Sequence, residues 1–190
     1  MLWAAATLLS ACVTAPRPAA PPLRPWAERA ALLQAVPHFT LDGRLAATNG
    51  KQGFSAGLRW RQQVNDASLQ LSGPLGFGAA RVQERDGQLT ITTSDGRTLT
   101  GAAAAAQLAG LLGFDPPLHS LRYWVLGVND PSMSAERSLD DRQRLALLQQ
   151  DGWRIVYDEY IPVRRYWLPR RLTLSHQQLR LKLVINAWQL

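Results

Sequence analysis

The side chains that could carry chemistry are few and lie far apart along the chain. His38, His119 and His176 show none of the short spacings, such as H-x-x-x-H, with which histidines bind a metal. The sequence contains no G-x-S-x-G nucleophile motif and no G-x-x-x-x-G-K-[ST] phosphate-binding motif. Asp158 and Glu159 are adjacent, and neighbouring residues of a strand point to opposite faces. We therefore predict no catalytic residues, no metal site and no cofactor.

Cys12 is the single cysteine, and its surroundings indicate a covalent modification. It follows Leu9-Ser10-Ala11 at the end of an apolar segment, which matches a bacterial lipobox, where the cysteine thiol receives diacylglycerol. A chance buried cysteine is the alternative, but the match ends an apolar run and precedes a linker. Because stable anchoring needs two or more acyl chains, at about 0.8 kcal/mol per buried CH₂, a triacylated N-terminus would suffice. No aspartate follows Cys12, which favours the outer membrane.

Three segments organise the 190 residues. Residues 1–11 resemble the apolar part of a signal peptide, and we expect the missing basic start to lie upstream. Residues 12–25 carry five prolines and predict an extended tether of about 3.1 Å per residue. Residues 26–190 form one domain of ordinary globular composition. No apolar run reaches the roughly 20 residues that cross a bilayer, which excludes a polytopic membrane protein.

Residue periodicity predicts a mainly β domain. Three helices are expected, at 26–36 (stopped by Pro37), at 102–113 and at 118–126, and 129–141 is expected to be a loop. Strands are expected wherever apolar and polar residues alternate, with turns at Asp86-Gly87, Asp95-Gly96 and Asp151-Gly152. Leu179, Leu181, Leu183, Ile185 and Ala187 should face one way, and Trp188 the other. About ten or eleven strands with few helices indicate a curved antiparallel sheet, barrel-like, with helices covering or plugging it.

At this point the chain resembles the LolB family, the outer-membrane lipoprotein receptors of Gram-negative bacteria. Apart from the lipobox, the resemblance rests on short motifs in a particular order: Gly73-Pro74-Leu75-Gly76, then residues 121–127, 152–157, 168–172 and 181–188. It implies an incomplete antiparallel β-barrel whose open side is closed by helices, LolA/LolB-like, with an apolar cavity. It also implies that acylated lipoproteins are accepted from a soluble, LolA-like periplasmic carrier and placed in the inner leaflet of the outer membrane. Gly73 and Phe77 depart from the family pattern.

A cavity for acyl chains would be lined by inward-pointing apolar residues. One acyl chain costs on the order of 10 kcal/mol to expose to water, so a carrier of lipoproteins needs such a space. For each candidate, ordinary core is the alternative, and the sequence does not separate a filled barrel from a hollow one. The candidates are Leu58, Trp60, Leu69, Leu71, Trp124, Trp153, Ile155, Leu183 and Ile185.

Leu75 and the arginines are the remaining candidates. Leu75 lies in a turn between Pro74 and Gly76, and the resemblance assigns to it contact with the membrane or the incoming lipid; a turn residue folded onto the core is the alternative. The net charge is +7, and all but two of the 21 basic residues are arginines. Such a surface attracts anionic headgroups or an acidic rim on the carrier. The densest group is Arg164, Arg165, Arg170 and Arg171, for which a merely solvated surface is the alternative.

Two other functions compete with a lipid-binding transfer protein. An outer-membrane-anchored lipid-processing enzyme would need a Ser/His/acid set, which the sequence does not display, and a structural lipoprotein would need none. A nucleic-acid binder is suggested by charge alone, and an exported, acylated chain is in the wrong compartment for it. We therefore expect a monomer whose partners are the carrier, the acylated cargo and outer-membrane phospholipid, with no nucleic acid.

Overall fold

The computed structural model describes residues 20–190 except 51 and 74–78. The predicted signal segment, Cys12, most of the tether and Leu75 lie outside the described residues. None of the described helices is both long and apolar enough to span a membrane.

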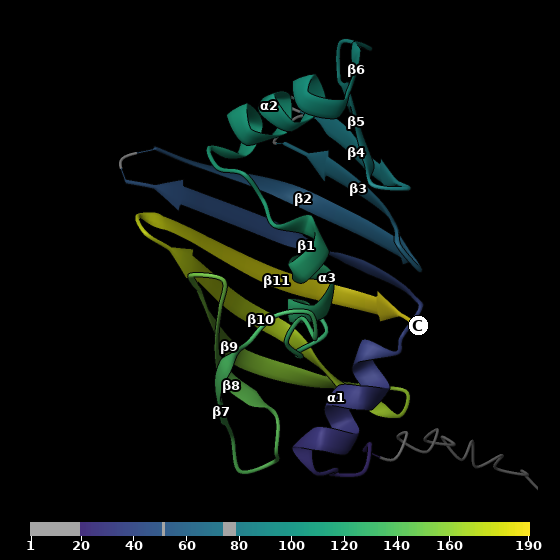
Figure 1. The fold of residues 1–190 in the computed structure, drawn as a ribbon, viewed down its shortest axis with the longest axis vertical. Coiled ribbons are helices and arrows are strands. Elements are labelled where there is room, and N and C mark those ends of the chain that lie inside the picture. The colour runs from purple at the N-terminus through teal and green to yellow at the C-terminus, as the bar shows by residue number, and fades with distance from the viewer. Residues whose placement is uncertain (1–19, 51, 74–78) are drawn as a thin grey trace, which may run out of the picture.

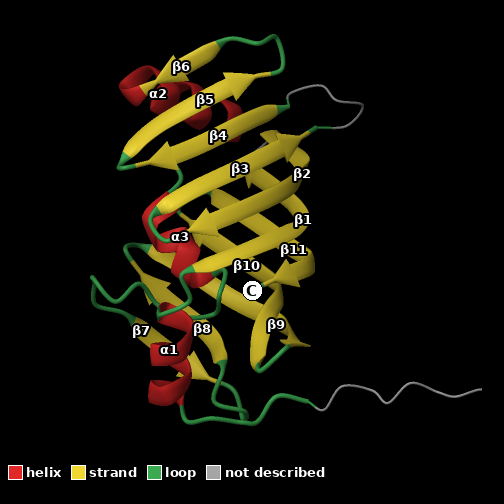
Figure 2. Ribbon diagram, turned by 90° about the vertical axis from the view of Figure 1, so that its right-hand side faces the viewer, coloured by secondary structure: helices red, strands yellow, loops and turns green. Residues whose placement is uncertain are grey.

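Eleven strands form one antiparallel sheet, drawn in Figures 1 and 2. Their spatial order is β6-β5-β4-β3-β2-β1-β11-β10-β9-β8-β7, so the first and last strands pair at the centre. The mainly β class and the strand number predicted from the sequence are confirmed. The strands are β1 (His38–Asn49), β2 (Gln52–Gln63), β3 (Asp66–Ser72), β4 (Ala80–Arg85), β5 (Gln88–Thr93), β6 (Thr98–Thr100), β7 (Glu136–Leu139), β8 (Leu145–Gln150), β9 (Trp153–Val163), β10 (Tyr166–His176) and β11 (Leu179–Gln189).

Three helices lie on the same face of this sheet, one after another along its length (Figure 2). They are α1 (Trp26–Gln34), α2 (Gly101–Leu112) and α3 (Leu118–Trp124), each within two residues of its predicted bounds. In α1 the apolar stripe buries Ala30 and Leu33, as its spacing predicts. In α2 the glycine at the C-terminal end, Gly113, has φ +77°, the left-handed geometry that ends many helices.

Strand alternation sets which side chains point toward the helices. In β2, Ala56, Leu58 and Trp60 are buried and their neighbours are not, as the sequence predicts. Two of the predicted turns have the geometry of two-residue hairpins: Asp86-Gly87 and Asp151-Gly152 have positive φ at both positions.

Two predictions about the strands were wrong. Residues 129–141 contain β7, an edge strand whose first three residues are exposed and therefore show no apolar alternation. In β11, Asp42 pairs with Ala187 and Gly43 with Ile185, so a β-bulge falls at Asn186. The bulge reverses the alternation, because one extra residue is inserted.

The reversal at the bulge changes the surroundings of the last residues of β11. Ala187 becomes exposed, and Trp188 turns toward the core. The Trp188 ring packs edge-on against Phe39, with ring centroids 5.7 Å apart. Its indole N–H donates to the carbonyl of Pro169 at 3.0 Å.

Gln150, at the end of β8, holds the chain that follows α3. Its buried Oε1 accepts hydrogen bonds from the Trp124 indole at 2.8 Å and from the Asp130 backbone N–H at 2.9 Å. Its Nε2 donates to the carbonyls of Asp130 at 2.8 Å and Met133 at 3.1 Å. One side chain thus satisfies four polar groups of the segment 124–133, which fixes that segment on the sheet.

We expect Gln150→Ala to lower the free energy of unfolding by about 3 kcal/mol, because several buried polar groups lose their partner at once. Gln149→Ala is the matched control: Gln149 is exposed, and its change should stay within about 0.5 kcal/mol. Urea unfolding of both variants measures the difference. Equal stabilities would contradict the role given to Gln150.

Candidate functional site

An apolar cavity of about 60 Å³ lies between the sheet and the helices α2 and α3. Its wall on the sheet side comes from six strands and its cover from the two helices and the segments that follow them. Every lining residue is apolar. Those on the sheet are Leu45, Leu58, Trp60, Leu69, Leu71, Val82, Leu174, Leu181 and Leu183; those on the cover are Leu108, Leu112, Phe114, Pro116, Leu118, Leu121 and Val125.

The cover follows from helical and turn geometry. Leu108 and Leu112 are four residues apart and share one face of α2, below which lies the sheet. Phe114 and Pro116 belong to the short connection between α2 and α3. Leu118 and Leu121 then occupy the facing side of α3. The two helices and their proline-containing connection thus form an apolar cover over strands whose cavity-lining side chains are mostly leucines.

Five of the nine predicted lining residues line this cavity: Leu58, Trp60, Leu69, Leu71 and Leu183. The other four are buried elsewhere in the core. Ile155 and Ile185 are fully buried away from the cavity. Trp124 is held by Gln150, and Trp153 stacks on His176 with ring centroids 5.1 Å apart. The residues of the cover were missed, although the helical spacing of Leu118 and Leu121 was visible in the sequence.

The two helices of the cover are held with unequal strength. The end of α3 is fixed by Trp124 and by Tyr157, whose hydroxyl donates to the Trp124 carbonyl at 2.9 Å. By contrast, α2 packs on β5 and β6 at the edge of the sheet, and the hydrogen bond at its C-terminal end, from Asn49 to the Gly113 carbonyl at 3.3 Å, is exposed. Burial of Leu108 and Leu112 stabilises its position by roughly 3–6 kcal/mol together. The helix α2 is therefore the part of the cover that separates most easily.

A Ser/His/Asp set does come together beside the cover. The Ser120 hydroxyl donates to Asp130 Oδ2 at 2.9 Å, and His119 Nε2 lies 3.6 Å from the same oxygen. The arrangement does not suit nucleophilic catalysis, because the serine bonds the acid instead of the histidine and is itself buried. The set instead joins α3 to the segment that Gln150 holds.

The carboxylate of Asp130 is buried and well bonded. Desolvation raises its pKa, but hydrogen bonds from Ser132 and Ser120, with the nearby His119, together outweigh that effect. The pKa of Asp130 therefore lies below its ordinary value of 3.8. Among the described residues, no three His, Cys, Asp or Glu side chains group as metal ligands.

The depressed pKa gives a pH dependence of stability. The unfolded chain binds the Asp130 proton more readily, so the stabilisation is complete above about pH 4 and is lost as the pH falls through the folded-state pKa. We expect Asp130→Asn to destabilise the protein by roughly 1–3 kcal/mol near neutral pH and by less in acid. Urea unfolding between neutral pH and pH ~2.5 measures this. Asp141→Asn, at an exposed turn, is the control; a pH-independent deficit for Asp130→Asn would contradict the assignment.

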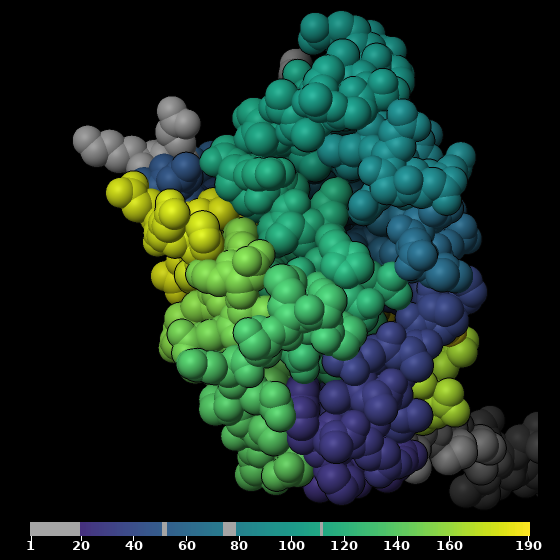
Figure 3. Space-filling model, in the orientation of Figure 1, coloured from purple at the N-terminus to yellow at the C-terminus, as the bar shows by residue number. Residues whose placement is uncertain are grey.

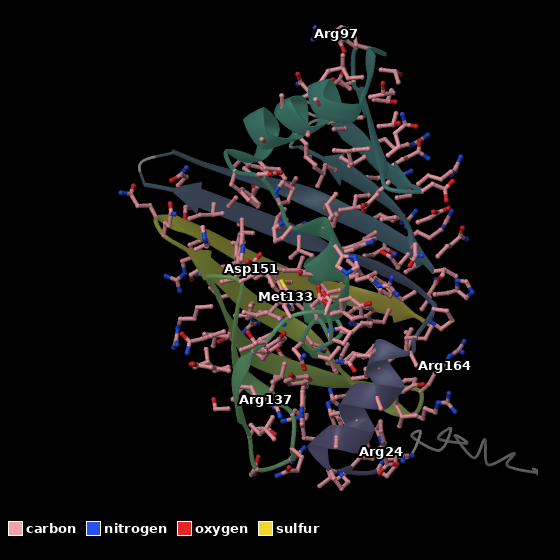
Figure 4. The ribbon with its side chains drawn as sticks, viewed as in Figure 1. Arg24, Arg97, Met133, Arg137, Asp151 and Arg164 are labelled. Carbon is pink, nitrogen blue, oxygen red and sulfur yellow. The ribbon has the colours of Figure 1, made fainter. Side chains whose placement is uncertain are left out.

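The four predicted arginines fall into two pairs. Arg170 and Arg171, on β10, both contact Glu159, at 2.9 and 3.5 Å. Arg164 and Arg165 form the turn between β9 and β10 and are exposed. Figure 4 labels Arg164 beside α1, Arg165 lines a hollow together with Arg29 of that helix, and neither arginine lines the cavity.

The fold places the chain in a class of proteins built on one open antiparallel sheet with helices on one face. A LolA superfamily protein from Nitrosomonas europaea superposes with a TM-score of 0.52 at 8% identity, over 86% of this chain and 90% of that one. A DUF1329 family protein from Desulfovibrio piger gives a TM-score of 0.54 at 6% identity, over the same shares. These likenesses define the fold.

Sequence comparison identifies the family. The family model described as outer membrane lipoprotein LolB matches residues 37–188. The chain is 34% identical over 186 residues to outer-membrane lipoprotein LolB of Nitrosococcus oceani, which covers 96% of this chain and 92% of that protein. It is 35% identical over 164 residues to the LolB of Pseudomonas aeruginosa, over 86% and 80% of the two chains. The chain belongs to the LolB family.

Proposed function

We propose that this protein is an outer-membrane lipoprotein receptor: it takes acylated lipoproteins from a LolA-like periplasmic carrier and inserts them into the inner leaflet of the outer membrane. The observation that carries the proposal is the wholly apolar cavity under a weakly held helix. Membership of the LolB family, whose name is that of an outer-membrane lipoprotein, supports the location. Transfer needs no covalent step, because a higher affinity for acyl chains than the carrier has is sufficient to drive it.

Acyl chains enter this cavity only if its cover moves. A volume of about 60 Å³ is well below that of a ligand pocket, roughly 300–1,000 Å³. Opening exposes Leu108 and Leu112, at roughly 3–6 kcal/mol, and an acyl chain that enters covers the same apolar surfaces again. Contacts with the acyl chain therefore offset the opening of α2. Leucines of β2, β3 and β11 supply the new surroundings of the lipid.

The rest of the proposal concerns residues beyond the described parts of the chain. Cys12 is proposed to carry the lipid that anchors the receptor, and Leu75 to contact the bilayer or the incoming lipid during delivery. One cavity within one domain is enough for this cycle, so we propose that the receptor acts as a monomer. Outer-membrane phospholipid is its third partner, after the carrier and the cargo.

The first test is a transfer reaction in solution. A form with Cys12→Ala is mixed with carrier loaded with a triacylated lipoprotein, and the two proteins are then separated. We expect most of the cargo on this protein, because the proposed direction of transfer requires the higher affinity here. Cargo that stays on an active carrier, with this protein folded, would disprove the receptor function.

The same reaction separates acceptance from delivery. Leu75→Glu should accept cargo as the unchanged chain does, yet release it to vesicles much more slowly. Ser72→Glu, at an exposed position three residues before Leu75, is the control for added negative charge. If both variants slow release equally, the special role of Leu75 fails.

A second test addresses the cover. Leu108→Ala should destabilise the protein by about 2–5 kcal/mol and speed the loading of a fluorescent fatty-acyl probe severalfold, because α2 loses one of the two leucines with which it lines the cavity. Leu148→Ala makes the same deletion at a fully buried position of β8 that does not line the cavity. It should cost similar stability without speeding loading. Stopped-flow fluorescence measures the rates, and equal acceleration in both variants would show that α2 is not the moving part.

A further inference from the structure

Four arginines surround a small hollow at the end of the molecule that carries α1. They are Arg24, before α1; Arg29, on α1; Arg142, in the turn between β7 and β8; and Arg165, in the turn between β9 and β10. Figure 3 shows these parts of the chain gathered at one end, and Figure 4 labels Arg24 there, with Arg164 beside the same helix. Residues far apart in the sequence thus form one positively charged surface, which we call the arginine hollow.

The segment that leads to the N-terminus is fixed at this hollow. Pro21 is buried, and its carbonyl accepts a hydrogen bond from the Trp167 indole at 3.0 Å. The Trp167 carbonyl in turn accepts a hydrogen bond from Arg29, and the Arg142 guanidinium lies 5.8 Å from the Trp167 ring centre. The described part of the chain therefore begins beside the hollow.

The charge at the hollow is only partly compensated. Arg24 pairs with Glu28, but within the described chain Arg29, Arg142 and Arg165 form no salt bridge. Arg29 is the least satisfied of the four arginines: it is 7% exposed, and its Nε has no hydrogen-bond partner among the described residues. The guanidinium donates to the Trp167 carbonyl, but a buried N–H of a charged group that lacks a partner is costly, so an anion that accepts from Nε would stabilise the site.

The small volume of the hollow favours an anionic group that projects from a surface. Its volume is about 10 Å³, which is space for roughly one water-sized group. A single anionic oxygen can enter, whereas the group that bears it stays outside. Leu23 lies in the same wall and is 60% exposed, the highest exposure among the large apolar side chains described. An exposed leucine beside arginines is the composition that binds at the headgroup layer of a membrane.

We propose that the arginine hollow binds the phosphate of anionic phospholipid headgroups and so seats the domain on the bilayer. The proposal rests on the proposed function, in that Cys12 carries the lipid anchor. Nine residue steps of tether separate Cys12 from Pro21, about 28 Å at 3.1 Å per residue. The hollow is therefore always within reach of the membrane surface, and Leu23 enters the headgroup layer beside it.

Vesicle binding tests the proposal. The Cys12→Ala chain is sedimented with vesicles of phosphatidylcholine, with or without phosphatidylglycerol. At about 1 kcal/mol per arginine near an anionic surface, Arg142→Gln with Arg165→Gln should weaken binding to the anionic vesicles about thirtyfold. Binding to the neutral vesicles should not change. Leu23→Ser should weaken binding to both kinds of vesicle, because it removes apolar contact and no charge.

The matched control is Arg170→Gln with Arg171→Gln, which removes the same charge from a pair already engaged by Glu159. It should weaken binding less than threefold. Equal losses for both pairs would reduce the effect to net charge and overturn the proposal. Specific binding of millimolar inorganic phosphate, without any preference for anionic vesicles, would overturn it too, since the ligand would then be a free anion.

The transfer reaction in solution distinguishes failure of this proposal from failure of the receptor function. The Arg142→Gln and Arg165→Gln chain should accept cargo from the carrier at the rate of the unchanged chain. If it accepts cargo poorly and binds vesicles normally, the arginine hollow docks the carrier and the proposal of a membrane contact is wrong. If the unchanged chain accepts no cargo but shows the arginine-dependent vesicle binding, the receptor function fails and the membrane contact stands.

Discussion

A single sheet that never closes leaves one large apolar face for which no second sheet is available. In this protein β6 and β7 are free edges, and the buried side chains of the strands between them must be covered by helices. Each helix covers only part of the sheet and is held there by its own contacts alone. The cavity and its removable cover follow from this arrangement, since a barrel closed by strand pairing would require broken backbone hydrogen bonds to open.

The two helices of the cover are held with unequal strength, because the buried hydrogen bonds are concentrated at the end of α3. Gln150, Asp130 and Tyr157 attach the end of α3 and the following segment to β8 and β9 through buried hydrogen bonds. The helix α2 has apolar contacts with the edge strands and an alanine-rich sequence that offers few of them. Buried hydrogen bonds are lost at a high cost, whereas leucine contacts can be replaced by contacts with another hydrocarbon. An acyl chain can therefore substitute for what holds α2, but not for what holds α3.

Local periodicity predicted most of the strands and only part of the site. Leu58, Trp60, Leu69 and Leu71 were assigned correctly to the inner face because strand alternation depends on neighbours alone. Alternation failed at the bulge in β11, since a single inserted residue leaves no mark in the apolar pattern. It also missed β7, because an exposed edge strand has no buried face. The lining from α2 and the arginine hollow depend on how distant segments pack. Of the four arginines that lie closest together in the sequence, Arg165 lines the hollow, whereas Arg170 and Arg171 contact Glu159, and Arg142 was missed.

The arginine hollow and the helix α2 lie at opposite ends of the sheet. The hollow and α1 are packed at the β7 end, and α2 lies over β5 and β6 at the other (Figure 1). A domain seated through the hollow would thus leave α2 free to move, because no residue of the hollow belongs to α2 or to its connection to α3. The segment 124–133, which Gln150 holds, follows α2 in the sequence and lies between α2 and the hollow in the fold. Opening of the cover therefore does not require release from the membrane, and the receptor can take up cargo while its anchored end stays in place.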